Sequence, residues 1–251
     1  MDKSVTVKNI TFREGETLIC VPLVGKSRDE LQSQAEYLAT VGADIIEWRV
    51  DHYAEVATSS LVLNALRAIR QALPHIPLIF TFRSKKEGGE CELSEEAYFA
   101  LNQQIAVSGL VDIIDIELFN DETRIRDAIA TAHASGVKVI MSSHDFQKTP
   151  AKEEIIHRLR RMQDLGADLP KIAVMPQCAE DVLRLLDATL TMKQQFATRP
   201  LITMSMGKIG GVSRVTGKLF GSAMTFGAAG QVSAPGQIEI RQLREIMSVL
   251  S

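Results

Sequence analysis

The sequence predicts an α/β fold, a (β/α)₈ TIM barrel that forms a single domain over residues 1–251. Short apolar segments rich in β-branched residues alternate eight times with amphipathic segments, and short connections join them. The length of 251 residues suits one such barrel. A doubly wound sheet is the rival fold, but no GxGxxG motif follows the first strand, which disfavours a nucleotide-binding version of it.

The expected elements follow one another in a regular order. The strands are expected at residues 18–24, 44–49, 78–83, 111–117, 138–144, 171–175, 201–205 and 223–226. Helices with one apolar stripe are expected at residues 28–40, 61–73, 94–108, 122–135, 152–165, 179–196, 212–220 and 238–250. Residues 4–12 precede the first barrel strand, and we expect them to form a β-hairpin that closes the bottom of the barrel.

Composition excludes several classes of partner. The net charge is −3 and the pI is about 6.0, and no Lys/Arg run indicates a nucleic acid or an anionic membrane. The first residues carry charges where a signal peptide needs an apolar run, and no segment has the length of a membrane span. Cys20, Cys91 and Cys178 are odd in number and far apart, so neither a disulfide framework nor a zinc site is indicated. We therefore expect a cytoplasmic protein that acts on a small molecule.

Ionisable residues occur within or directly after the expected strands, which should be buried on both faces. Most of them fall at the carboxyl ends of strands, where barrels of this kind place their active sites. They are Glu47, Arg49, Arg83, Asp115, Glu117, His144, Asp145, Lys171 and Arg214. A structural ion pair explains each one alone equally well, but a functional site explains the set better, because all face one mouth of the barrel.

Lys171 opens the sixth strand, and alternation along the strand gives Lys171 and Ala173 the same direction. If that direction is inward, the lysine stem rises through the barrel centre and the small Ala173 leaves room above it. Burial disfavours a charged amine, and the arginines named above would favour its neutral form by repulsion. A neutral buried amine can attack a ketone. The alternative is a structural lysine whose tip reaches solvent at the barrel bottom.

His144 ends the strand that precedes the strand of Lys171. Imidazole titrates near neutral pH, so His144 is the candidate general acid and base, with Glu47 or Glu87 as the carboxylate that orients it. The alternative is a core histidine with satisfied hydrogen bonds. The remaining histidines are expected at the surface: His52, His75, His133 and His157.

Arg49, Arg83 and Arg214 suit a carboxylated and hydroxylated substrate, since the guanidinium fork matches a carboxylate. Phosphate is the competing ligand, because the segment MGKIGG at residues 206–211 is similar to a phosphate-binding loop. Residues 232–237, VSAPGQ, suit a closing lid, and an ordinary turn is the equal alternative.

Six motifs in order give the chain a resemblance to type I 3-dehydroquinate dehydratases over about residues 18–250. The motifs are EWRVDHY (47–53), TFRSKKEGGE (81–90), SSHDF (142–146), PKIAVMP (170–176), MGKIGGVSR (206–214) and SAPGQ (233–237). The resemblance implies a (β/α)₈-barrel homodimer that needs no cofactor and no metal. It also implies the syn dehydration of 3-dehydroquinate to 3-dehydroshikimate, a carbon–oxygen lyase reaction of the shikimate pathway to aromatic amino acids.

The same resemblance implies roles for individual residues. Lys171 matches the Schiff-base lysine, His144 the general acid and base, and Glu87 a carboxylate associated with that histidine. Six further residues match substrate-binding positions: Glu47, Arg49, Arg83, Arg214, Ser233 and Gln237.

Three alternatives to a dehydratase remain from the residues themselves. A class I aldolase would use the same lysine to break a carbon–carbon bond. A metal-dependent sugar isomerase would hold a divalent cation on the acidic residues and His144, although the arginines would repel the cation. A barrel that binds a metabolite without turnover is the third alternative.

Overall fold

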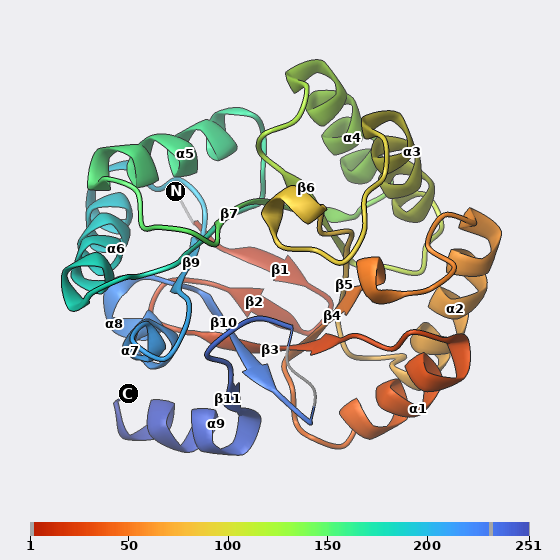
Figure 1. Cartoon of the computed structure of the whole chain (residues 1–251), viewed down its shortest axis with the longest axis horizontal. Coiled ribbons are helices and arrows are strands. Elements are labelled where there is room, and N and C mark those ends of the chain that lie inside the picture. Colours follow the sequence, from red (N-terminus) through yellow and green to blue (C-terminus); the bar gives the residue numbers. More distant parts are fainter. Residues whose placement is uncertain (1–2, 231–232, 251) are drawn as a thin grey trace.

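The structure is a computed structural model that describes residues 3–230 and 233–250. Within these residues, eight parallel strands form a ring with helices around its outside (Figure 1). The strands of the ring are β3 (Leu18–Leu23), β4 (Ile45–Arg49), β5 (Leu78–Thr81), β6 (Ile113–Glu117), β7 (Lys138–Asp145), β8 (Leu169–Val174), β9 (Ile202–Ser205) and β10 (Met224–Ala228). Neighbours pair in chain order from β3 to β9, and β10 pairs with β3.

The ring is closed between its last two strands by a short contact. Leu201 and Ser222 form a parallel bridge, and the N–H of Ala223 donates to the carbonyl of Leu201 at 2.7 Å. The predicted (β/α)₈ barrel is therefore confirmed.

Helices cover the outside of the ring, and several of them begin at a polar side-chain cap. The helices are α1 (Arg28–Leu38), α2 (Ser59–Ala72), α3 (Glu95–Ala106), α4 (Glu122–Ala134), α5 (Lys152–Asp164), α6 (Ala179–Thr191), α7 (Gly211–Val215), α8 (Gly217–Phe220) and α9 (Ile240–Val249). Ser27, Ser94 and Asp121 each accept a hydrogen bond from the backbone N–H three residues further on. These caps satisfy N–H groups that have no partner inside the first turn, and so fix where the helices start.

The prediction of one continuous helix over residues 212–220 is wrong. Residues 212–220 form the two short helices α7 and α8, because Thr216 has non-helical angles of φ −105° and ψ 14°. Gly217 then packs so closely on the β9–β10 connection that a Cβ there would lie 2.8 Å from the carbonyl oxygen of Ser222. The chain turns at this point, and no amphipathic pattern indicates such a turn.

Two further helix boundaries differ from the prediction. Residues Ile238–Glu239 form β11 beside β10, so the last helix starts only at Ile240, with the Glu239 side chain as its cap. The helix expected at residues 179–196 changes to a π-helical turn at Met192–Phe196. The π-helical turn lies near the N-terminal hairpin, since Lys193 pairs with Glu14, whereas β11 lies at the mouth of the barrel, directly after the cavity-lining Gln237.

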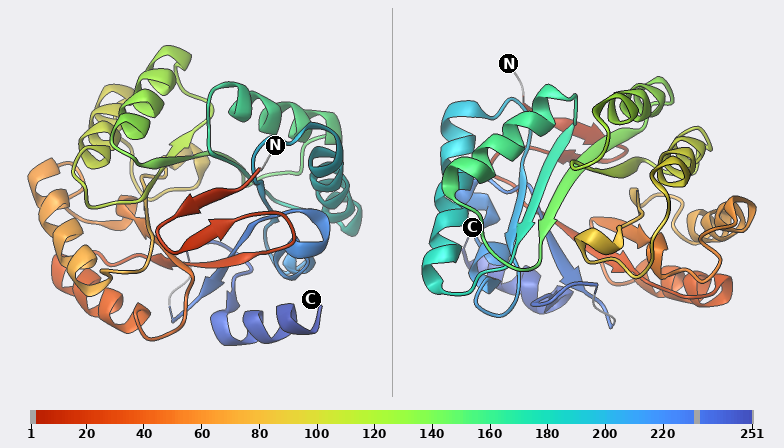
Figure 2. Two further views of the ribbon diagram at one scale, coloured as in Figure 1. Left: turned by 180° about the vertical axis from the view of Figure 1, so that it is seen from behind. Right: turned by 45° about the horizontal axis from the view of Figure 1, so that its top comes forward.

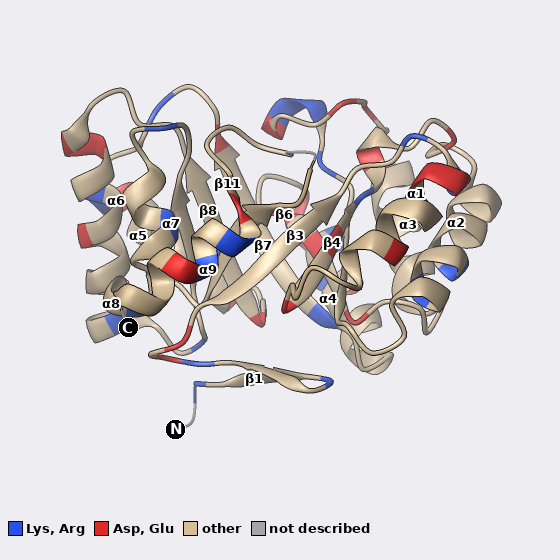
Figure 3. Cartoon of the chain, turned by 90° about the horizontal axis from the view of Figure 1, so that it is seen from below, with Lys and Arg blue, Asp and Glu red and all other residues tan. Residues whose placement is uncertain are grey.

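The N-terminal hairpin lies across one open end of the barrel (Figures 2 and 3). It consists of β1 (Val5–Val7) and β2 (Ile10–Phe12), which pair antiparallel. Val5, Val7 and Phe12 belong to one buried apolar cluster with side chains from the surrounding strands. The predicted hairpin that closes the barrel bottom is confirmed.

Alternation along each strand sends neighbouring residues to different cores. On β4, Ile46 and Trp48 pack in the cluster between the sheet and the helices, whereas Ile45 belongs to the cluster inside the ring. The lower interior layer is apolar around the ring: Ile45, Ile79, Ile113, Ile140, Leu169 and Ile202. Two residues further along the same strands, the buried side chains become polar: Glu47, Thr81, Asp115, Ser142 and Lys171, with Met204 on β9 as the exception. The barrel interior thus changes from apolar to ionised one layer above the hairpin.

Candidate active site

The carboxyl ends of the strands surround an open cavity, with about 450 Å³ of empty space when the part open to solvent is included. Its lining includes every site residue that the sequence predicted: Glu47, Arg49, Glu87, Arg83, His144, Lys171, Arg214, Ser233 and Gln237. Apolar walls come from Met204, Met206 and Phe226, and the small Ala173 stands above the lysine position. A concave site with apolar walls and a few convergent polar groups is typical of a small-molecule site.

Lys171 lies on the floor of this cavity with only 4% of its side chain exposed. Its Nζ atom is 3.4 Å from Asp115 Oδ2, 3.5 Å from Glu47 Oε1, and 4.7 Å from the ring centre of Phe226. The expected inward direction is correct, and Arg49, Arg83 and Arg214 line the same cavity as expected, but the charged groups nearest to the amine have the opposite sign. The ionic groups in contact with the amine are carboxylates, because closing the ring brings β4 and β6 across to β8.

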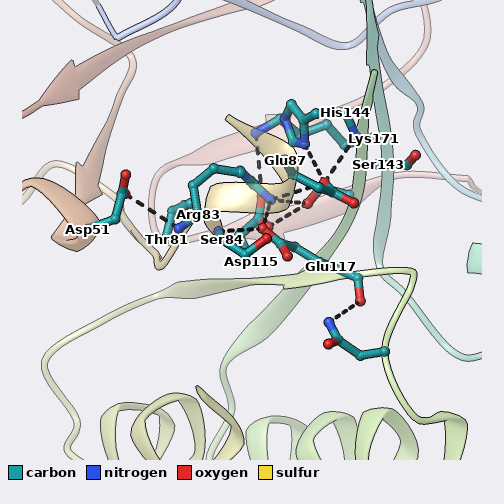
Figure 4. A network of polar contacts seen from close by, with 12 residues as sticks. Asp51, Thr81, Arg83, Ser84, Glu87, Asp115, Glu117, Ser143, His144 and Lys171 are labelled. Carbon is teal, nitrogen blue, oxygen red and sulfur yellow. Dashed lines mark hydrogen bonds and ion pairs between the residues drawn. The ribbon is translucent and has the colours of Figure 1, made fainter. Parts of the chain in front are cut away.

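His144 is oriented by Glu87, the second of the two carboxylates that the sequence offered. Glu87 Oε2 lies 2.9 Å from Nδ1 of His144 and also accepts the backbone N–H of His144 at 3.0 Å (Figure 4). Glu87 belongs to the short 3₁₀ helix Lys85–Glu87, which ends at Gly88 with a φ of 85°. A side chain at Gly88 would collide with the ring of Phe146, so glycine is needed to bring Glu87 against the histidine.

The histidine and its carboxylate partner favour an uncharged pair. Burial, with smaller contributions from Glu117 and Asp115, raises the pKa of Glu87 to about 8. Burial, followed by the nearby Arg83 and Lys171, holds the pKa of His144 well below its usual range. At neutral pH the imidazole is therefore a free base, which is the form that removes a proton.

Arg83 lines the cavity and is the centre of a buried ionic network at its base. Its Nη1 donates to Glu117 Oε1 at 2.9 Å and to Ser142 Oγ at 2.8 Å, and its Nη2 lies 2.9 Å from Asp115 Oδ2. Burial would lower the pKa of this arginine, but Asp115 and Glu117 outweigh burial and raise it well above its usual range. The guanidinium is thus permanently charged, and its charge is compensated within the chain.

Asp115 and Glu117 were noted in the sequence as charges in a core strand but were not predicted as site residues. Burial would raise the pKa of Asp115, yet Arg83 and Lys171 together hold it below its usual value. The available signal was the spacing of two acidic residues at i and i+2, which places both on the inner face. Their partners lie too far along the chain to be read from that spacing.

Arg49 is held by a residue that sequence reasoning missed, Asp51. The Nε and Nη2 atoms of Arg49 each lie 2.8 Å from a different oxygen of Asp51, a two-point ion pair, and its Nη1 donates to the carbonyl of Ser233 at 3.4 Å. His52, predicted at the surface, is half-buried beside Asp51, whereas the other three histidines with that prediction are exposed.

Arg214 differs from the other two arginines of the cavity. It is 1% exposed, and within the described residues it donates hydrogen bonds to two carbonyls, of Pro235 at 3.0 Å and of Phe226 at 3.4 Å. Its Nε atom has no partner in the described part of the chain, and burial lowers the pKa of Arg214 to about 10. A buried cation without a carboxylate partner is costly, and an anionic ligand would relieve that cost.

The segment Ser233–Gln237 forms the wall beside Arg214; Val232, the first residue of the expected lid, lies outside the described residues. Gln237 Nε2 donates to Ser233 Oγ at 3.1 Å, and its Oε1 accepts the N–H of Ser233 at 3.0 Å. Gly236, at a φ of 79°, lies so close to Gly207 that a Cβ would be 2.3 Å from the Gly207 carbonyl oxygen. The loop therefore rests on the 206–207 segment in this structure.

Two alternative sites find less support in the geometry. Lys208 of the suspected phosphate loop is exposed and is not among the residues that line the cavity. Three of the acidic residues considered as metal ligands, Glu47, Asp115 and Glu117, contact Lys171 or Arg83 instead. The described residues contain no group of three or more His, Cys, Asp or Glu side chains that could hold a metal ion.

The fold and these contacts define the class of the protein. It is a (β/α)₈ barrel whose mouth holds a buried lysine, an uncharged histidine–carboxylate pair and an arginine that has no carboxylate partner within the described residues. Comparison with known proteins then identifies the family. The family model for type I 3-dehydroquinase matches residues 19–251, and the chain belongs to that family. The resemblance seen in the motifs is confirmed, and with it the prediction of a dehydratase, a carbon–oxygen lyase.

Individual relatives agree over the whole chain. The 3-dehydroquinate dehydratase of Klebsiella pneumoniae subsp. pneumoniae is 72% identical over 251 residues, which is 100% of both chains. That of Listeria welshimeri is 56% identical over 246 residues, 98% of this chain and 97% of the relative. The crystal structure of type I 3-dehydroquinate dehydratase from Clostridium difficile, with covalently modified comenic acid, superposes with a TM-score of 0.97 at 52% identity, covering 100% of this chain and 98% of that one. None of the helices in the described residues is long and apolar enough to cross a membrane.

Proposed function

We propose that this protein dehydrates 3-dehydroquinate to 3-dehydroshikimate through an imine on Lys171, as the dehydratase step of the shikimate pathway. The observation that carries the proposal is the cavity itself, which combines a buried amine, a free-base imidazole and an arginine with no carboxylate of its own. A nucleophile, a proton carrier and an anion anchor are the three groups that imine chemistry on a ketone carboxylate needs.

The first half of the reaction forms the imine. His144 takes one proton from the Lys171 ammonium, and Nζ attacks the C3 ketone carbon. His144 returns the proton to the carbinolamine oxygen, which leaves as water with a second proton from nitrogen. The result is an iminium that carries the same single positive charge as the original ammonium.

The second half eliminates water. His144 removes the C2 proton, and the electron pair of that C–H bond moves toward the iminium to give an enamine. The enamine pair then expels the C1 hydroxyl, which leaves as water with the proton held on His144. Addition of one water molecule to the conjugated iminium releases 3-dehydroshikimate and restores Lys171. Glu87 supports each transfer because it fixes the ring of His144 at Nδ1.

The remaining cavity residues are proposed to hold the substrate. Arg214 binds the carboxylate, and Glu47, Ser233 and Gln237 bind hydroxyl groups. Arg49 and Arg83 face the cavity but bond mainly to carboxylates of the chain, so we assign them a weaker, electrostatic contribution to substrate binding. The likeness to the family also supports a single-domain, cytoplasmic homodimer, for which sedimentation equilibrium of the purified chain is the test of assembly.

The decisive experiment is reductive trapping. Borohydride added with 3-dehydroquinate should inactivate the protein and add the mass of the reduced ligand to the peptide that contains Lys171. Lys171→Ala should abolish both label and turnover, and Lys208→Ala, which removes an exposed lysine beside the mouth, should change neither. A label on any other lysine would exclude the assignment, and cleavage of a carbon–carbon bond in place of dehydration would identify an aldolase.

A further inference from the structure

Asp115 and Glu117 are buried carboxylates on β6 that have no part in the reaction proposed above. Asp115 is 0% exposed, and of the two it is the one in contact with Lys171. We propose that Asp115 is a positioning residue for Lys171, and that its carboxylate is the fixed counter-charge of the iminium. The inference rests on the proposed imine on Lys171 and extends it to a residue that does not line the cavity.

The carboxylate of Asp115 is held from both sides. Oδ1 accepts the hydroxyl of Ser142 at 2.6 Å, and Oδ2 lies 2.9 Å from Arg83 Nη2 and 3.4 Å from Lys171 Nζ. Ser142 is paired with Lys171 across the β7–β8 ladder, so the group that orients Asp115 belongs to the strand next to the lysine. Asp115 therefore cannot turn away from Nζ without losing hydrogen bonds in a buried site.

Glu47 also reaches the amine, but its surroundings differ. Its Oε1 atom is 3.5 Å from Nζ and accepts the hydroxyl of Thr81 at 2.9 Å, and the residue lines the cavity. Glu47 can therefore exchange the amine for a substrate hydroxyl when a ligand enters. Asp115 lies below the cavity floor and keeps its contact with nitrogen before and after the imine forms.

The charge of Asp115 persists through the reaction because of its neighbours. Arg83 and Lys171 hold the pKa of Asp115 below its usual value in spite of burial. The other charged or titratable groups around Asp115 and Lys171 come from the strands on either side and from α3. They are Cys20 of β3, Glu47 of β4, Arg83 and Glu87 after β5, Tyr98 of α3, Glu117 of β6 and His144 of β7.

A fixed negative charge at nitrogen has a defined chemical effect. The ammonium, the carbinolamine ammonium and the iminium carry their positive charge on the same atom, 3.4 Å from Asp115. The counter-charge keeps the imine protonated, and a protonated imine accepts the electron pair of the C2–H bond far better than a neutral one. The pH at which the imine loses its proton, and with it the alkaline limit of activity, is therefore set in part by Asp115.

The test replaces Asp115 by an isosteric neutral residue. In Asp115→Asn, the alkaline limb of turnover should move to lower pH than in the wild type, because the imine loses its proton more easily without the counter-charge. Turnover at neutral pH should fall on the order of 10²-fold, the effect of removing one electrostatic contact at a reacting centre.

The matched control is Glu117→Gln. Glu117 is also buried on β6 and contacts Arg83 at 2.9 Å, but within the described residues it forms no ion pair with Lys171. Both variants weaken the network around Arg83 and should lower the melting temperature, whereas only Asp115→Asn should displace the alkaline limb of turnover. Equal displacement in the two variants, or none in Asp115→Asn, would overturn the inference.

A measurement on the unmodified protein covers the case in which Asp115→Asn does not fold. In an equilibrium mixture with substrate and product, the C=N infrared band of the wild type should shift on transfer to D₂O at every pH at which the enzyme turns over. An imine that has lost its proton at neutral pH would contradict the counter-charge. Absence of any label on Lys171 in the wild type would instead remove the proposed function, so the two failures are distinguishable.

Discussion

The lower and upper halves of the barrel interior are formed by the same strands but contain opposite kinds of buried side chain, apolar below and ionisable above. Below, the side chains nearest the hairpin are Ile and Leu residues packed with Val5, Val7 and Phe12. Above, one inward position further along, Lys171 and Asp115 lie buried with their charges. The two layers are only about 6–7 Å apart along a strand. Burial stabilises the lower layer through the hydrophobic effect, whereas burial in the upper layer costs free energy that pairing offsets only in part.

The difference predicts which measurement responds to a change in each half. Substitutions in the lower half should change the free energy of unfolding and leave the chemistry intact. Substitutions in the upper half should change rate, binding or pH dependence with smaller losses of stability. The predictions below test this separation, from the largest expected effect to the smallest.

His144→Ala removes the proton carrier of the upper half. Turnover should fall by at least about 10²–10⁴-fold, the contribution of a general acid or base to one step, and His144 serves several steps. Some imine should still form and be trapped by borohydride, which single-turnover mass spectrometry detects. His157→Ala, which removes an exposed histidine on α5, is the control and should keep its turnover. Near-normal turnover of His144→Ala would refute its role.

Ile140→Ala creates a cavity in the packed lower half of the barrel interior, two residues before Ser142 on β7. Unfolding in urea should show a loss of about 2–5 kcal/mol, the cost of a large-to-small change in a packed core. Ile140→Val should lose about 0.5–1.5 kcal/mol, which gives a graded control. Both variants should keep the wild-type kcat at temperatures where they remain folded. A large loss of kcat in folded Ile140→Val would break the separation between the two halves.

Arg214→Met removes a cation from the upper half and keeps an apolar stem of similar length. The KM for 3-dehydroquinate should rise by a factor equivalent to about 1.5–3 kcal/mol, the value of hydrogen bonds to a charged group. The melting temperature should stay the same or rise, because the buried guanidinium has no carboxylate partner within the described residues. Arg124→Ala, an exposed arginine on α4, should change neither quantity. A lower melting temperature with unchanged KM would make Arg214 a structural residue.

The Glu87–His144 pair predicts how stability depends on pH. Since the folded-state pKa of Glu87 is about 8 and its usual value is 4.5, the folded protein keeps a proton that the unfolded chain loses, and stability falls as pH rises between these values. The pKa of His144 is shifted the other way, so its contribution is lost as pH falls below its usual value of 6.5. Between pH 6.5 and 8 only the Glu87 effect operates.

Glu87→Gln isolates this effect. From pH 6.5 to 8 the wild type should lose about 1–2 kcal/mol more unfolding free energy than the variant does, following from about 1.4 kcal/mol per pH unit for one proton. Urea unfolding of both proteins at the two pH values is the measurement. Parallel pH profiles would mean that Glu87 is already ionised in the folded protein.

The sequence by itself determined the barrel and the members of its site. A period of two in the strands and 3.6 in the helices is local information, and it fixed the eight repeats and the closing hairpin. The position of Arg83 and His144 at the ends of short apolar runs is also local information. Because all the parallel strands end at one mouth, that position predicted that these residues would line one cavity, as they do. The motifs then gave the family without any knowledge of distances.

Only the tertiary structure decided which ionisable side chains contact one another in the site. Asp115 and Lys171 are 56 residues apart, and nothing between them indicates that carboxylates, and not the arginines of the same cavity, would contact the amine. The choice of Glu87 over Glu47 as the partner of His144 depended on a turn at Gly88 whose conformation comes from packing against Phe146. The physical reason is the same in both cases: local periodicity assigns each side chain to a face, but ring closure sets the distances across the barrel, and electrostatic energies depend on those distances.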